Sequence, residues 1–203
     1  MIDSYRTLAA PATARIMRKK SRFIADAVPV ASTNDANREL AMVRKRHHDA
    51  SHHCYAYRLL DDAGSTSHSE DAGEPSGSAG LPILQQIESS GLLNILVVVS
   101  RYFGGTKLGI GGLVRAYGDA AREVLEAANP VETKLRVDVS IDFPIEVNSC
   151  VMAIIHRHQA DVQEIAYDER VRARLSLPPS GVDGFCEAII ETTGNRARIE
   201  VAR

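Results

Sequence analysis

The sequence predicts an α+β protein of two domains. Apolar residues recur at helical spacing in some segments and form short, strand-like runs in others. A chain of 203 residues, 44% of them hydrophobic, suits one large or two small globular domains. A change of pattern near residues 130–134 marks a boundary. The predicted domains are therefore residues 1–131 and residues 132–203.

The first domain is expected to begin with a hairpin. Residues 12–30 contain two strands that turn near "RKKS". A helix follows over residues 32–48, because its apolar positions share one face and Ser32 or Thr33 can cap it. Residues 51–60, "SHHCYAYRLL", predict a strand bounded by an acidic turn.

The middle of the chain alternates glycine-rich loops with buried elements. Residues 70–80, "EDAGEPSGSAG", are a loop by composition, and a short helix capped by Ser78 follows. "LNILVVVS", residues 93–100, is apolar at almost every position and predicts a central strand. The strongest helical pattern runs from Leu113 to Ala128 and ends at Asn129–Pro130.

The second domain reads as a βαββαβ unit, which is the ferredoxin-like, split-βαβ order. The expected elements are a strand at Leu135–Phe143, a helix at Ile145–His158, strands at Asp161–Tyr167 and Val171–Leu177, a helix at Gly181–Thr192 and a strand at Ala197–Val201.

Charge and cysteine content limit the classes of function. The net charge of −2 means that a nucleic-acid surface has to be a local patch. Three widely spaced cysteines without a C-x-x-C pair indicate a reducing compartment rather than a disulfide framework or a zinc site. The run Ile95–Val99 is too short to span a bilayer, and no signal-like apolar region opens the chain. We therefore expect a cytoplasmic protein without membrane association.

The most unusual stretch is "VVVSRYFGGTKLGIGG", residues 97–112. Its five glycines are Gly104, Gly105, Gly109, Gly111 and Gly112. Backbone N–H groups there precede a helix N-terminus, and Arg101, Lys107 and Arg115 add positive charge, so the loop is a candidate anion site. It matches neither the P-loop nor the dinucleotide G-x-G-x-x-G pattern. The alternative is a tight strand-to-helix crossover that needs glycine for positive φ.

A second basic cluster lies at the predicted hairpin tip. It consists of Arg18, Lys19, Lys20 and Arg22. Together with the glycine-rich loop it would form an electrostatic footprint suited to RNA. Tyr102 is a candidate to stack on bases, whereas Phe103 is expected to fill the core. The "RKR" of residues 44–46 is explained by the end of a helix, where cations complement the dipole.

The acidic loop is a candidate cleft. Asp71, Glu74, Ser76 and Ser78 bring carboxylates and hydroxyls together, although the nucleophile pattern G-x-S-x-G is missed by one glycine. A solvated acidic turn that leads into a helix is the favoured alternative, and an internal salt-bridge partner of the basic loop is a further one. His52 and Cys54 share one strand face, but two ligands do not make a zinc site. We expect neither a metal nor a cofactor.

Four stretches together resemble the Impact/YigZ family in its bacterial two-domain form. They are "KKSRFIA", "SHHCYAYR", "EDAGEPSGSAGLPIL" and "VVVSRYFGGTKLGIGGLVRAY", and they span residues about 19 to 117. The sequence departs from the family pattern by an inserted Ala72, by Ser78 in place of threonine and by Leu81 in place of lysine. The last change removes a positive charge from the expected site.

The resemblance implies a first domain like domain 2 of ribosomal protein S5 and a ferredoxin-like second domain, a pair similar to the last two domains of elongation factor G. It implies a role in translation, because eukaryotic relatives regulate translation by competing for a ribosome-associated activator of a stress kinase. The leading hypothesis is a binding protein that contacts RNA, the ribosome or a ribosome-associated protein. The rival is an enzyme for a phosphorylated or small acidic substrate in the cleft between loops 70–80 and 101–112. A third is an interaction adaptor with rigid loops. The sequence carries no signal for an oligomeric state.

Overall fold

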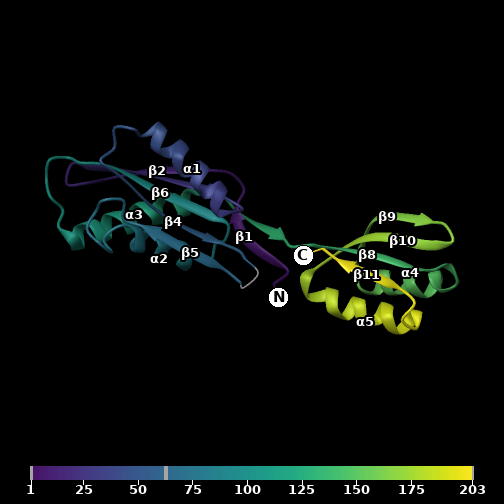
Figure 1. The fold of residues 1–203 in the computed structure, drawn as a ribbon. Helices are drawn as coiled ribbons and strands as arrows, with labels where there is room; N and C mark the ends of the chain where they lie inside the picture. The colour runs from purple at the N-terminus through teal and green to yellow at the C-terminus, as the bar shows by residue number, and fades with distance from the viewer. Residues whose placement is uncertain (1, 62–63, 203) are drawn as a thin grey trace. The chain divides into compact units, whose positions relative to one another are not determined.

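The computed structural model of the protein describes residues 2–61 and 64–202. The chain forms two compact units of mixed helices and strands, as predicted (Figure 1). One unit comprises residues 6–132. The other comprises the residues from Thr133 onward, together with those before Arg6.

The first unit is built on a five-stranded antiparallel sheet in the order β2-β3-β6-β4-β5. Its strands are β2 Ala12–Arg18, β3 Ser21–Pro29, β4 His52–Leu59, β5 Thr66–Glu70 and β6 Ile95–Tyr102. The predicted central strand is β6, and its residues from Ile95 to Arg101 are all buried. The predicted hairpin is the pair β2 and β3.

Helices cover both faces of this sheet (Figure 1). Helix α1 (Thr33–Arg46) packs on one face, while α2 (Gly80–Ser90) and α3 (Ile110–Ala127) pack together on the other. Both faces of β6 are therefore buried, which explains why its apolar run does not alternate with polar residues. Ser32 caps α1 as expected, since its hydroxyl accepts the N–H of Asp35.

Three strands were not predicted. Strand β5 reads "TSHSE", has no buried residue and pairs with β4 at the sheet edge, so its sequence gave no apolar signal. Strands β1 (Ser4–Leu8) and β7 (Pro130–Lys134) form a separate two-stranded sheet. The proline that ends α3 is also the first residue of β7, a position where proline is tolerated. The predicted domain boundary falls within β7.

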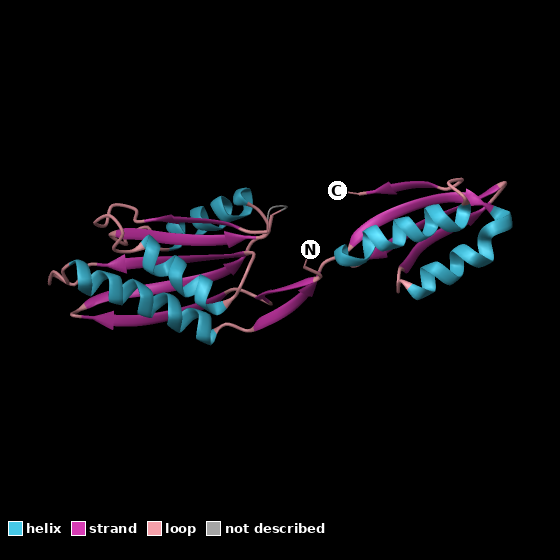
Figure 2. Cartoon of the chain, turned by 90° about the horizontal axis from the view of Figure 1, so that it is seen from below, coloured by secondary structure: helices cyan, strands magenta, loops and turns pink. Residues whose placement is uncertain are grey.

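The second unit has the predicted βαββαβ order. Its elements are β8 Val137–Pro144, α4 Asn148–Arg157, β9 Asp161–Tyr167, β10 Arg170–Leu177, α5 Val182–Thr193 and β11 Arg198–Val201, with short 3-10 turns at Ile145–Val147 and Pro179–Gly181. The strands form an antiparallel sheet in the order β11-β8-β10-β9. Helices α4 and α5 lie on one face and share a core with the sheet (Figure 2).

Candidate functional site

The glycine-rich loop joins the end of β6 to the start of α3 and touches the β2–β3 hairpin tip. A Cβ atom on Gly104 would lie 2.1 Å from the carbonyl group of Lys20, so only glycine allows this approach. The Gly104 N–H also donates to the Ser21 hydroxyl oxygen at 3.2 Å. The fold thus brings together two basic segments that are about 80 residues apart in the sequence.

Two further glycines are required by backbone conformation. Gly105 has φ 81° and Gly109 has φ 73°, both in the left-handed region. Gly109 is the N-cap of α3, no side chain caps that helix, and its first turn contains no acidic residue. Gly111 has neither requirement, because an added Cβ would meet nothing within 4 Å. The need for a tight strand-to-helix connection therefore explains only some of the five glycines in this loop.

Arg101, predicted to contact phosphates, does not lie free beside the glycines but is buried. Its side chain is 7% exposed, and its Nη1 atom donates to Glu74 Oε1 at 2.6 Å. The ring centroids of Phe23 and Phe103 lie 5.7 and 5.5 Å from its guanidinium carbon. Alternation along β6 turns Arg101 toward the α2–α3 face, where the 70–80 loop supplies its counter-ion.

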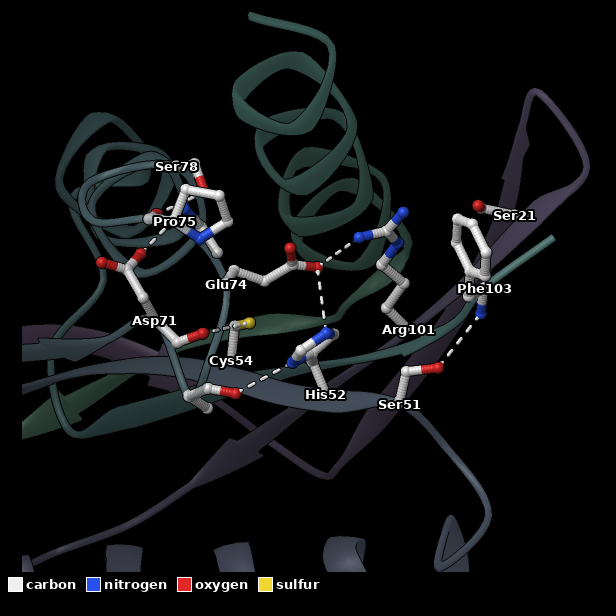
Figure 3. Close-up of polar contacts among 12 residues, drawn as sticks. Ser21, Ser51, His52, Cys54, Asp71, Glu74, Pro75, Ser78, Arg101 and Phe103 are labelled. Atoms are coloured by element: carbon white, nitrogen blue, oxygen red, sulfur yellow. Dashed lines mark hydrogen bonds and ion pairs between the residues drawn. The ribbon is translucent and has the colours of Figure 1, made fainter. Parts of the chain in front are cut away.

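Glu74 is the centre of a buried polar cluster (Figure 3). Besides Arg101, it accepts the hydroxyl of Tyr117 at 2.8 Å. The Nε2 atom of His52 lies 4.0 Å from the same oxygen, and the other ring nitrogen of His52 is 3.1 Å from the carbonyl oxygen of Ala72. Burial raises the pKa of Tyr117, so its hydroxyl remains a donor. This cluster joins β4, β6, α3 and the acidic loop.

Asp71 caps helix α2, in place of the predicted Ser78. Its carboxylate accepts three backbone N–H groups, those of Gly77, Ala79 and Gly80. Burial raises the pKa of Asp71, but the three hydrogen bonds outweigh it and the net pKa is lowered. Ser78 is fully buried and donates to the carbonyl oxygen of Pro75 at 2.6 Å.

Cys54, which lies beside the candidate cleft, is held by the loop, whereas Ser76 of the cleft is exposed. The thiol of Cys54 donates to the carbonyl oxygen of Asp71 at 3.0 Å, and burial raises its pKa to about 12. Among residues 2–61 and 64–202, no group of three or more His, Cys, Asp or Glu side chains could hold a metal ion. The carboxylates that seemed available for chemistry are engaged in capping and in the ion pair.

Four basic side chains of the β2–β3 hairpin tip, the glycine-rich loop and the start of α3 are exposed and have no ion-pair partner among the described residues. We call them the basic rim: Lys19, Lys20, Lys107 and Arg115. Lys19 and Lys20 form the hairpin turn, with φ 44° and 68°. Arg18, next to them, pairs with Asp119 at 2.9 Å on the surface of α3.

Of the two aromatic residues after Arg101, Tyr102 is half-buried and Phe103 is exposed. The guanidinium carbon of Arg22 lies 3.9 Å from the centroid of the Tyr102 ring, and the Tyr102 hydroxyl donates to Asp49 at 3.2 Å. This ring is therefore already covered on one face. Phe103, expected in the core, is 51% exposed because it follows the last residue of β6.

Sequence reasoning missed Tyr117 as a member of the polar cluster, because its position in the apolar stripe of α3 indicated a core residue. His52 and Cys54 did share a strand face as predicted, and both lie at the cluster. The two-residue spacing of His52 and Cys54 therefore predicted correctly that they share a strand face, and it did not indicate a metal site.

The fold and the site define a class of protein with two α+β units. In the first unit, a glycine-rich loop joins β6 to α3 next to the buried ion pair of Glu74 and Arg101. The Impact N-terminal domain matches residues 19–125, and a domain of unknown function, DUF1949, matches residues 151–196. The chain belongs to the IMPACT family, as a member of the bacterial YigZ/YvyE type. Among the described residues, no helix is both long and apolar enough to cross a membrane.

The bacterial relatives cover nearly the whole chain, whereas a mammalian relative matches less than half of it. An IMPACT family member of Thermus thermophilus is 39% identical over 90% of this chain and 98% of its own length. IMPACT family member YigZ of Escherichia coli is 33% identical, over 91% of each chain. A crystal structure of a hypothetical protein has a TM-score of 0.70 at 29% identity and covers 100% of this chain and 99% of its own. Protein IMPACT of Rattus norvegicus is 36% identical over 47% of this chain and 31% of its own length.

Proposed function

We propose that this protein binds the phosphate backbone of RNA through the basic rim, as a translation-linked protein acting on the ribosome or a ribosome-associated factor. The observation that carries the proposal is the contact of Gly104 with Lys20, which places two separate basic segments at one edge of the first unit. An overall charge of −2 makes this local concentration of unpaired cations notable.

The start of helix α3 supports the same proposal. Its N-cap is Gly109, without a side-chain cap and without an acidic residue in the first turn. The first N–H groups of a helix favour anions, and here the exposed Lys107 and Arg115 flank them in the sequence. A phosphate at this position would be bound by both backbone and side chains.

We further infer that the first unit has the fold of ribosomal protein S5 domain 2 and that the second is ferredoxin-like. The support for the second assignment is its βαββαβ order and its antiparallel sheet in the order β11-β8-β10-β9. The pair would resemble the last two domains of elongation factor G. We do not propose the enzyme alternative, since Asp71, Glu74 and Ser78 are all engaged by internal hydrogen bonds.

Binding of a fluorescent oligouridylate, measured by anisotropy across salt concentrations, tests the proposal. For single-stranded RNA each phosphate contact contributes about −0.7 to the slope of log K against log salt. Replacing Lys19 and Lys20 by alanine should therefore make the slope shallower by about 1.4. The matched control is Arg44→Ala with Lys45→Ala, which removes two exposed charges from α1 and should leave the slope unchanged. Equal effects of the two variants would refute a localised rim.

A further inference from the structure

Phe103 is an exposed aromatic ring next in sequence to Gly104, which contacts the Lys20 backbone of the basic rim. Its side chain is 51% exposed, whereas Phe23, Phe143 and Phe185 are fully buried. It stands between β6 and the glycine-rich loop. A single exposed apolar side chain is ordinary on a protein surface, so this ring points to a ligand only together with the cations of the basic rim.

The ring is fixed from the protein side. The Phe103 N–H donates to the hydroxyl oxygen of Ser51 at 3.3 Å. The guanidinium carbon of Arg101 lies over the ring, 5.5 Å from its centroid, and Glu74 in turn fixes Arg101. A ligand that stacks on such a ring needs to order little of the protein, which favours tight binding.

The surroundings of the ring select the kind of ligand. Gly104, the next residue, contacts the backbone of Lys20, and Lys107 lies further along the same loop. Cations beside an exposed aromatic ring are the arrangement by which proteins bind single-stranded nucleic acids, since bases stack while phosphates meet the cations. In a duplex, the base faces are already stacked on one another and are closed to the ring.

We propose that Phe103 stacks on an unpaired base, so that the RNA recognised by the basic rim is single-stranded. This inference rests on the proposed function and adds the class of RNA to it. Alanine substitution of such a stacking residue weakens binding by about 5- to 150-fold. The ring neutralises no phosphate, so its loss leaves the salt slope unchanged.

The test uses the full chain and three substitutions at one position. Phe103→Ala and Phe103→Leu remove the aromatic ring, the second while keeping an apolar side chain of similar size. Phe103→Trp keeps a stacking surface and introduces the sole tryptophan of the chain. Probes are oligouridylate and a blunt RNA duplex of equal length. Thermal unfolding by circular dichroism is expected to be unchanged, because the side chain is exposed.

The inference predicts that the alanine and leucine variants bind oligouridylate about 5- to 150-fold more weakly at an unchanged salt slope, while the tryptophan variant retains affinity. Tryptophan fluorescence should be quenched by oligouridylate and not by polyglutamate, which offers charge without bases. Two results overturn the inference alone: wild-type affinity in the leucine variant, or equal binding of duplex and single strand. Absence of salt-dependent binding to both RNAs overturns the proposed function as well.

Discussion

Replacing Glu74 by alanine should strongly destabilise the first unit. The side chains of Glu74 and Arg101 are 4% and 7% exposed, and the carboxylate also accepts the hydroxyl of the fully buried Tyr117. The substitution leaves a buried guanidinium without a counter-ion, and breaking a buried pair in this way costs about 3–5 kcal/mol. That is a large part of the about 5–15 kcal/mol that stabilises a typical domain.

Urea unfolding followed by circular dichroism measures the effect, with amide exchange in β4 and β6 to assign it to the first unit. At about 4 °C per kcal/mol, the melting temperature should fall by about 10–20 °C. The matched control is Glu88→Ala, which removes an exposed carboxylate from α2 and should change stability by less than about 0.5 kcal/mol.

The double variant Glu74→Leu with Arg101→Met separates a charge effect from a packing effect. Because a buried ion pair can often be replaced by apolar side chains at little cost, the double variant should be more stable than Glu74→Ala. If Glu74→Ala matches Glu88→Ala, then the pair does not fix the crossover, and the structural role assigned to Arg101 is wrong.

Three further outcomes are expected. Gly104→Ala should destabilise by about 1–3 kcal/mol or more, through overlap with the hairpin backbone, whereas Gly111→Ala, which meets no atom and lies in a helix, should stabilise by about 0.5–1 kcal/mol in the same urea assay. A disulfide reagent at pH about 8 should label the exposed Cys150 rapidly and leave Cys54 unlabelled until urea unfolds the chain, because the thiolate is the reactive form. Because the pKa of Asp71 is lowered by folding, its carboxylate contributes stability that is complete above the unfolded pKa of about 3.9 and is lost as pH falls through the folded value. Asp71→Asn should therefore flatten the acid side of the stability profile, and an unchanged profile would contradict the cap.

The elements with regular apolar patterns were predictable from the sequence. The stripe of α3, the all-apolar β6 and the βαββαβ order of the second unit each follow from side-chain burial. Strand β5 was not predictable, because this exposed edge strand contains no buried apolar residue and its pairing with β4 leaves no apolar pattern in its own sequence. The ribbon of β1 and β7 was missed for a similar reason, since its two strands lie more than 120 residues apart in the sequence.

The site was harder to predict, because charge in the sequence does not reveal where a counter-ion lies. Loop 70–80 and β6 both looked available for ligands, yet each satisfies the other through Glu74 and Arg101. The sequence also did not reveal that Tyr102 is half-buried while the next residue, Phe103, is exposed. It depends on which residue ends β6, and element ends are the least certain part of any sequence-based assignment.

Because Arg101 is buried and paired with Glu74, it belongs to the scaffold of the loop and not to its cationic surface. A free guanidinium in a glycine-rich loop would have been one mobile cation among several. Buried and paired with Glu74, it instead fixes the end of β6, on which Phe103 and Gly104 depend for their positions. Gly104 in turn admits the Lys20 backbone, so that the exposed ring and the hairpin cations are held at one place. Loss of the buried pair should therefore weaken RNA binding even at temperatures where the chain remains folded, although neither of its side chains contacts the ligand.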